Sequence, residues 1–161
     1  MNISNFKNPF FIGVAGVGMS AIAQYLQGIG MQVSGSDRYF HEGEYNKTKE
    51  QLENEGIKCF LQDGSGITAE TDLVVVSTAI EDTVYEVKKA KELGIPIIKR
   101  SQLLAMIAKS KKTIAVAGTS GKSTTSAMLF QILLDAGLEP SIISGAGFTS
   151  IKKKKKIGNA Y

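Results

Sequence analysis

Short apolar runs alternate with amphipathic stretches along the first two thirds of the chain. Apolar runs at residues 9–14, 31–34, 57–60, 73–76 and 96–98 predict five strands. Helical spacing predicts helices over residues 46–55, 84–93 and 100–109. A further helix is predicted after the first strand: Gly30 caps it, and its apolar face consists of Met19, Ile22, Ala23, Leu26 and Ile29. Strands that alternate with helices indicate an α/β domain with a parallel sheet.

A glycine-rich turn follows the first strand. Gly13, Gly16 and Gly18 precede the first helix, and Asp37 comes 19 residues after Gly18, just beyond the second strand. Such a βαβ unit places a pyrophosphate at the helix N-terminus and an acidic residue near a ribose or base, as in Rossmann-like domains. The order G-x-x-G-x-G differs from that of nicotinamide-binding turns. Two alternatives stay open: glycines that only allow close packing, and Asp37 as a turn residue.

Two further segments follow strands and are expected at the same crevice. Residues 77–80 follow the fourth strand, and Arg100 follows the fifth. Ligands of open α/β sheets bind beyond the carboxyl ends of the strands. Arg100 at such an end suits an anion contact, although a solvent-exposed helix start explains it equally well.

A second glycine-bearing loop begins the last third of the chain. The apolar run 114–117 predicts a buried strand, Gly118-Thr-Ser-Gly-Lys-Ser123 follows, and residues 122–136 predict a helix. In a phosphate-binding loop the backbone N–H groups surround an anion, the lysine reaches the outer phosphates and the serine hydroxyl holds Mg²⁺. The loop is two residues shorter than the common form. The alternative is a simple turn with an exposed lysine.

The second half predicts only part of a domain. Its helix is apolar nearly all round, which predicts burial on more than one side. A strand is expected at 140–143 and a loop at 144–150, and we expect residues beyond about 144 to be mobile or paired with another chain. The predicted division is a Rossmann-like domain at 1–109 and the beginning of a P-loop ATP-binding domain at 110–161.

Composition narrows the class of protein. Removing the run of five lysines at 152–156 from the net charge of +4 leaves −1, so the basic character is local. No aromatic residues interleave with that run, which argues against nucleic acid. No apolar run is long enough to span a bilayer, and Cys59 is the single cysteine. We therefore expect a cytoplasmic protein with no membrane partner, with Cys59 packed beside a strand.

Four segments occur in an order and spacing that resemble one family. Residues 11–20, 34–37, 75–80 and 115–124 resemble the N-terminal part of the Mur ligases, most of all their alanine-adding branch. The resemblance covers about residues 9–143 and only about a third of a family member. It implies UDP-sugar binding by Gly16, Val17, Gly18, Met19, Ser20, Ser36, Asp37, Arg38, Ser77, Thr78, Ala79 and Ile80, with Arg100 as a further candidate. It implies ATP binding by Gly118, Thr119, Ser120, Gly121, Lys122, Ser123 and Thr124, with Lys122 catalytic and Ser123 on Mg²⁺.

The resemblance also implies a reaction. ATP would phosphorylate the carboxylate of UDP-N-acetylmuramate to an acyl phosphate, and the amino group of L-alanine would then form the amide. Ser120 replaces the histidine usual in this branch, so another Mur ligase branch stays open. The family's metal-binding glutamate and amino-acid-binding domain lie outside the resemblance, so we expect no complete catalytic cycle. The rivals are an NAD-binding module or oxidoreductase and a P-loop regulator without turnover. Self-association is a further expectation.

Overall fold

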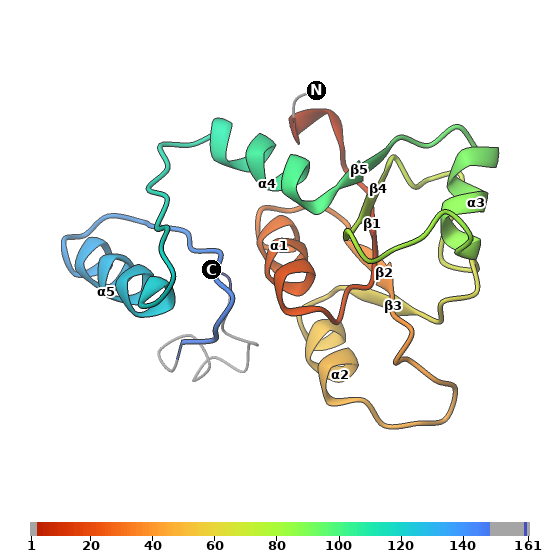
Figure 1. The fold of residues 1–161 in the computed structure, drawn as a ribbon, viewed down its shortest axis with the longest axis horizontal. Helices are drawn as coiled ribbons and strands as arrows, with labels where there is room; N and C mark the ends of the chain where they lie inside the picture. The colour runs from red at the N-terminus through yellow and green to blue at the C-terminus, as the bar shows by residue number, and fades with distance from the viewer. Residues whose placement is uncertain (1–2, 149–159, 161) are drawn as a thin grey trace.

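A five-stranded parallel sheet forms the centre of the molecule in a computed structural model that describes residues 3–148 and 160 (Figure 1). The strands lie in the order β3-β2-β1-β4-β5. Their bounds are β1 (Pro9–Ile12), β2 (Ser34–Ser36), β3 (Lys58–Phe60), β4 (Leu73–Val76) and β5 (Ile97–Lys99). The chain leaves the central β1 to build one side of the sheet and returns beside it as β4, which confirms the predicted Rossmann-like architecture.

Helices cover both faces of the sheet. After the short 3-10 helix η1 (Ile3–Asn5), they are α1 (Val17–Gly28), α2 (Lys47–Asn54), α3 (Tyr85–Glu92), α4 (Arg100–Lys109) and α5 (Lys122–Asp135). Helix α3 lies on one face, and α1 and α4 lie on the other (Figure 1). Gly30 has φ 96°, and its N–H bonds to the Gln27 carbonyl, which confirms the predicted glycine cap of α1.

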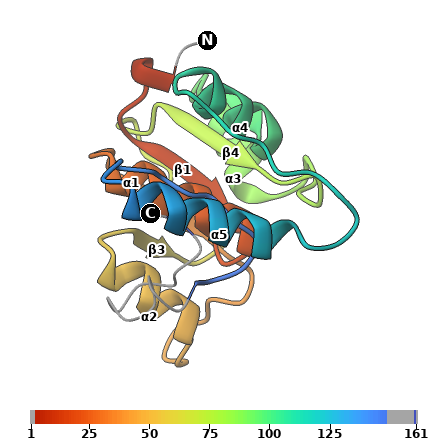
Figure 2. The same ribbon diagram turned by 90° about the vertical axis from the view of Figure 1, so that its left-hand side faces the viewer.

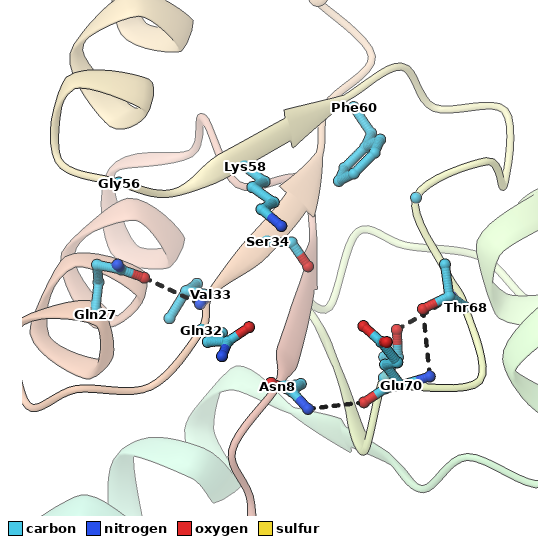
Figure 3. Close-up of a pocket in the computed structure, with 12 residues that line it drawn as sticks. Asn8, Gln27, Gln32, Val33, Ser34, Gly56, Lys58, Phe60, Thr68 and Glu70 are labelled. Atoms are coloured by element: carbon cyan, nitrogen blue, oxygen red, sulfur yellow. Dashed lines mark hydrogen bonds between the residues drawn. The ribbon is translucent and has the colours of Figure 1, made fainter.

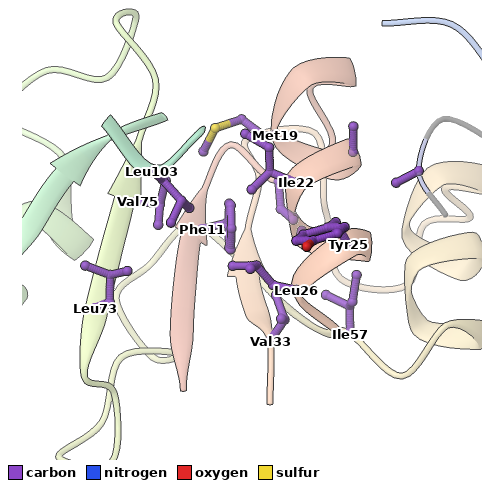
Figure 4. Close-up of a cluster of buried hydrophobic side chains, with 14 of the residues drawn as sticks. Phe11, Met19, Ile22, Tyr25, Leu26, Val33, Ile57, Leu73, Val75 and Leu103 are labelled. Carbon is purple, nitrogen blue, oxygen red and sulfur yellow. The ribbon is translucent and has the colours of Figure 1, made fainter. Parts of the chain in front are cut away.

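Alternate strand residues supply two hydrophobic clusters. Phe11 and Val75 face the larger cluster with α1 and α4, whereas Phe10 and Val74 face the smaller one with α3. Figure 4 shows side chains of the larger cluster between α1 and the strands. Cys59 of β3 packs against this cluster as predicted, and burial raises the pKa of its thiol to about 12. All four residues of β1 and the first three of β4 are buried, which is typical of parallel strands covered on both faces.

The first strand was expected at 9–14 but ends at Ile12, because the N–H groups of Gly13 and Val14 both bond to the Ser36 carbonyl. Two further predicted strands are shifted along the sequence. The second was expected at 31–34, but β2 begins only at Ser34, because the N–H groups of Gln32 and Val33 bond to the Lys7 carbonyl and the Gln27 side chain. The fifth was expected at 96–98 and lies at 97–99; Pro96 has no N–H for the ladder, although its carbonyl accepts from Val74. The bounds of β4 and α4 agree with the prediction.

The second half differs most from its prediction. Residues 114–117 form no strand, and the Ile114 side chain is 64% exposed. Helix α5 exists as predicted, but only Phe130 within it is buried, so the prediction of burial on several sides is wrong. Residues 140–143 form no strand either, apart from one bridge between Ile143 and Ala160. In the described part of the chain no sheet lies against α5 to bury its apolar faces (Figures 1 and 2).

Three expectations fall wholly or partly outside the described residues. They concern the loop at 144–150, the mobility beyond residue 144 and the lysine run at 152–156. Within the described part of the chain, no helix is both long and apolar enough to cross a membrane.

Candidate functional site

The carboxyl edge of the sheet brings most of the predicted site residues together. Strands β1 and β4 are adjacent and in register from Pro9 opposite Leu73 to Ile12 opposite Val76. The turn after β1 therefore lies beside the turn after β4, and a side-chain carbon at Gly13 would come 3.9 Å from Cδ1 of Ile80. This is the point where the chain reverses its direction across the sheet, which is where ligands of such sheets bind.

The Arg100 guanidinium lies against the glycine-rich turn. A Cβ added to Gly18 would come within 3.0 Å of Arg100 Nη1 and 3.3 Å of its Cζ. Gly18 lies in the first turn of α1, where the helix carries partial positive charge. Within residues 3–148 and 160, the salt bridge that forms joins Lys91 and Asp82, so no carboxylate there neutralises Arg100. A guanidinium at a helix N-terminus suits a phosphate or diphosphate.

Most backbone N–H groups of the glycine-rich turn already have acceptors inside the protein. Those of Gly13 and Val14 bond to the Ser36 carbonyl. That of Ala15 bonds to the Asp37 carboxylate, and those of Gly16, Met19 and Ser20 bond to carbonyls of the same turn. For the Gly18 N–H, no acceptor is found in the described part of the chain. Among the described residues, this edge thus brings together the Gly18 amide, the Arg100 guanidinium and the N-terminus of α1.

Several predicted contact residues lie below the surface of the turn. Met19 is 3% exposed and Ser20 is 2% exposed, and the Ser20 hydroxyl donates to the Val17 carbonyl. Ser36 is fully buried, and Asp37 is 4% exposed. By contrast, Val17 is 55% exposed at the start of α1.

The turn after β4 is more open. Thr78 and Ala79 are exposed, and Ser77 and Ile80 are partly buried. The Ser77 hydroxyl oxygen accepts from the Ala79 N–H at 3.4 Å, and the Ser77 carbonyl accepts from the Ile80 N–H. These bonds shape the turn and leave its outer face to solvent.

A cavity of about 380 Å³ lies where β2 and β3 end. Asp37 and Arg38 line it, and Arg38 is turned to donate to the Tyr39 hydroxyl at 2.8 Å. The other lining residues were missed by the sequence reasoning: Phe40, His41, Glu42, Leu61, Gln62 and Asp63. The sequence feature that could have pointed to them is their position, because each follows the end of a strand. The Ser65 hydroxyl and N–H bond to Asp63 and lower the pKa of its carboxyl group.

The second glycine-bearing loop differs from the first in its hydrogen bonds. No acceptor within the described residues is found for the backbone N–H groups of residues 119–124, and the first paired amide is that of Thr125, which bonds to Gly121. Gly118 and Gly121 have φ of 151° and 75°, a region that favours glycine. Lys122 Nζ donates to the carbonyls of Gly118 and Thr119, at 2.6 and 3.1 Å.

This loop fits a polyphosphate. Consecutive unpaired amides, a lysine that reaches over the loop and a helix N-terminus with no acidic residue in its first turn all favour negative charge. Ser123 offers one hydroxyl toward a cation. Among the described residues no group of three or more His, Cys, Asp or Glu side chains could hold a metal ion.

A second hollow, of about 330 Å³, lies near the opposite ends of the strands (Figure 3). Its polar groups largely serve the backbone: Asn8 donates to the Glu70 carbonyl, and Gln27 accepts from Val33. Thr68 Oγ1 accepts from the Glu70 N–H. None of the predicted site residues lines it, so the carboxyl edge remains the candidate site.

Comparison with known proteins agrees with this geometry. The family model described as "Mur ligase family, catalytic domain" matches residues 10–112, which include the sheet, the glycine-rich turn and Arg100. The chain belongs to the Mur ligase family. The loop at 118–124 lies beyond the residues that this model matches.

Curated relatives match nearly the whole chain. The UDP-N-acetylmuramate–L-alanine ligase of Dichelobacter nodosus is 37% identical over 155 residues, which are 96% of this chain and 31% of the relative. That of Clostridium kluyveri is 42% identical over 156 residues, 96% of this chain and 33% of the relative. The chain thus spans about a third of the length of the curated Mur ligases that it matches.

Solved structures show the same fold. UDP-N-acetylmuramate–alanine ligase from Thermotoga maritima has a TM-score of 0.80 at 28% identity, over 96% of this chain and 34% of its own. UDP-N-acetylmuramate:L-alanyl-gamma-D-glutamyl-meso-diaminopimelate ligase from Neisseria meningitides has a TM-score of 0.77 at 29% identity, over 90% of this chain and 44% of its own. Mur ligases with different amino components therefore share this fold.

Proposed function

We propose that this chain carries the UDP-sugar site and the ATP loop of an ATP-dependent ligase that joins L-alanine to UDP-N-acetylmuramate. The observation that supports it most is the Arg100 guanidinium over Gly18 at the N-terminus of α1. This pairing supplies a cation and a helix dipole where a diphosphate would lie. The alanine branch is favoured because curated relatives at 37–42% identity carry that name.

The chemistry assigned to the chain is positioning and charge stabilisation. The amides of residues 119–124 and Lys122 would hold the phosphates of ATP, and the Ser123 hydroxyl would contribute to Mg²⁺ binding. When bound, Mg²⁺ would neutralise phosphate charge. The muramoyl carboxylate would take the terminal phosphoryl group of ATP and release ADP, and the amino group of L-alanine would then displace phosphate from the acyl phosphate and, with loss of a proton, form the amide.

The division into domains belongs to the same proposal. Residues 1–109 form the UDP-sugar domain, and residues 110–161 belong to the ATP-binding domain. We expect the 161-residue chain to bind UDP-N-acetylmuramate without turnover, since it spans about a third of the length of its relatives. The protein acts in the cytoplasm in peptidoglycan precursor synthesis, with neither nucleic acid nor membrane as partner.

Calorimetry with UDP-N-acetylmuramate and with NADH tests the substrate class. We expect heat of binding with the UDP-sugar and none with NADH, because the turn lacks the usual nicotinamide glycine order. Arg100 and Gly18 suit the diphosphate of either ligand, so the glycine order is what separates the two. Binding of NADH without binding of the UDP-sugar would refute the proposal.

Arg100→Ala tests the role of the guanidinium. Loss of a charge-assisted contact is expected to weaken UDP-sugar binding about tenfold or more. Lys91→Ala is the matched control, because it also removes one positive charge, but from an exposed pair with Asp82. Lys91 belongs to α3, which lies on the other face of the sheet from α1 and α4 (Figure 1). Equal affinities for the Arg100 variant and this control would contradict the assignment.

A further inference from the structure

Both oxygens of the Asp37 carboxylate accept hydrogen bonds from the protein's own backbone. Oδ2 accepts from the Ala15 N–H at 2.9 Å, and Oδ1 accepts from the Tyr39 N–H at 3.1 Å. The residue is 4% exposed. An acidic residue at this point of a βαβ unit is expected to contact a ribose or base. Asp37 does line the cavity where β2 and β3 end, but both of its carboxylate oxygens already accept from backbone N–H groups.

These two bonds join the glycine-rich turn to the end of β2. The Ser36 carbonyl already holds the N–H groups of Gly13 and Val14, at 2.8 and 3.0 Å. Asp37 adds the next amide, that of Ala15, so three successive amides of the turn point toward β2. The turn is thereby fixed where Gly16 ends it and the first turn of α1, with Gly18 and Arg100, faces outward.

Charge gives the same conclusion. A carboxylate that faced the diphosphate would repel it, whereas two N–H donors and burial hold this one beneath the turn. Hydrogen bonds to a charged acceptor are stronger than neutral ones, so one aspartate can fix a turn that contains several glycines.

We propose that Asp37 is a positioning residue for the diphosphate site: it acts through the Ala15 amide and does not bind the nucleoside. The inference rests on the proposed function for the identity of the ligand. The effect of Asp37 on the glycine-rich turn can also be measured without any ligand.

The test compares Asp37→Ala and Asp37→Asn with the wild-type 161-residue chain. Asparagine keeps one carbonyl acceptor of similar shape, so this variant separates loss of the bond from loss of the fold. The matched control is Asp72→Asn, because Asp72 also accepts from two backbone N–H groups, those of Lys7 and Asn8, but at the opposite edge of the sheet. The probes are UDP-N-acetylmuramate, inorganic pyrophosphate and uridine, titrated by NMR, together with hydrogen exchange of the Ala15 amide.

We expect faster exchange of the Ala15 amide in both Asp37 variants, most in Asp37→Ala. Affinity for pyrophosphate and for the UDP-sugar should fall about tenfold in Asp37→Ala, the equivalent of one hydrogen bond to a charged group. Uridine shifts should stay unchanged, and Asp72→Asn should behave as wild type in all four measurements.

Other outcomes overturn the inference. Loss of uridine binding with intact pyrophosphate binding would show that Asp37 contacts the nucleoside. Equal losses in Asp72→Asn would show a general effect on folding. If the wild-type chain bound no UDP-sugar, the proposed function would be refuted. Unchanged exchange of the Ala15 amide in the Asp37 variants would refute the positioning role, whether or not the chain binds the UDP-sugar.

Discussion

The backbone of Gly66 passes so close to two aromatic rings that a larger residue has no room. A Cβ there would lie 2.6 Å from Cε2 of Phe10 and 2.7 Å from Cγ of Phe60. Phe10 is fully buried in the centre of the sheet, so it has little freedom to move away. Gly66→Ala is therefore expected to lower the free energy of unfolding by about 1–3 kcal/mol, the usual cost of overpacking. Urea denaturation measures it.

Gly28→Ala is the control for this prediction. Nothing lies within 4 Å of the position of its Cβ, and it is a helical residue at the end of α1. Alanine there should stabilise the protein by about 0.5–1 kcal/mol, because alanine loses less conformational entropy in a helix than glycine does. If the two substitutions changed the free energy of unfolding equally, the close approach at Gly66 would make no contribution to stability.

For individual residues, the sequence predicted the position of some members of the candidate site but not the orientation of others. For Arg100, its place after a strand left an anion contact and a solvent-exposed helix start equally open; the residue is exposed, and its guanidinium lies against Gly18. The alternatives for Asp37 could not be separated, because a carboxylate after β2 can turn toward a ligand or toward the first turn. The choice depends on the Ala15 N–H, 22 residues away in the sequence, and no local pattern reports it.

At the scale of elements, the largest departures from the prediction fall on segments without a strand partner in the described chain, whereas β2, which pairs on both sides, is only shifted by local hydrogen bonds. Strand β4 and helix α4 have the predicted bounds, since β4 pairs on both sides and α4 packs on the sheet. The run at 114–117 has an apolar pattern as strong as that of β1, yet no described strand lies beside it and it stays irregular. Periodicity predicts which residues can form a strand, whereas pairing decides whether they do.

Helix α5 exposes apolar side chains that no other described part of the chain covers. Met128 and Ile132 are each 61% exposed and lie one turn apart. We expect the purified chain to self-associate through this apolar face, because two buried side chains of this size contribute about 1.5–3 kcal/mol each. Met128→Lys combined with Ile132→Lys should weaken self-association at least tenfold, measured by sedimentation velocity over a concentration series.

The control for α5 is Gln131→Lys. It adds a lysine to an exposed polar position of the same helix and leaves both apolar side chains in place. Its self-association should match that of wild type. A wild-type chain that stays monomeric at every concentration would contradict the prediction.

At the scale of the whole molecule, both glycine loops lie under a cationic side chain. Arg100 lies over the start of α1, and Lys122 lies over the loop before α5. The supports differ, however: the first turn is tied to β2 by Ser36 and Asp37, whereas the second has no paired amide from residue 119 to 124 in the described chain. The first loop is therefore shaped by the sheet, whereas the contacts found for the second loop among the described residues come from Lys122 of its own helix.

This difference predicts how the chain behaves when it is divided at the proposed domain boundary. Residues 1–109 include all five strands of the sheet, and among the described residues that follow, Ile143 and Ala160 pack in or against the larger cluster. We expect residues 1–109 alone to unfold cooperatively, with a free energy of unfolding within about 2 kcal/mol of the full chain, since one aliphatic side chain and one alanine are lost from the cluster. Their affinity for UDP-N-acetylmuramate should be unchanged, because Gly18, Asp37 and Arg100 are all retained.

Chemical denaturation and calorimetry on the two chains measure these quantities. Residues 110–161 alone serve as the complementary control and should show no cooperative transition, because Phe130 and Ile142 are the only residues of their small cluster that are buried in the described part of the chain. If residues 1–109 failed to fold, or lost the UDP-sugar while remaining folded, the division at residue 109 would be wrong. The second half would then be part of the first site, through the contacts that Ile143 and Ala160 make with the larger cluster.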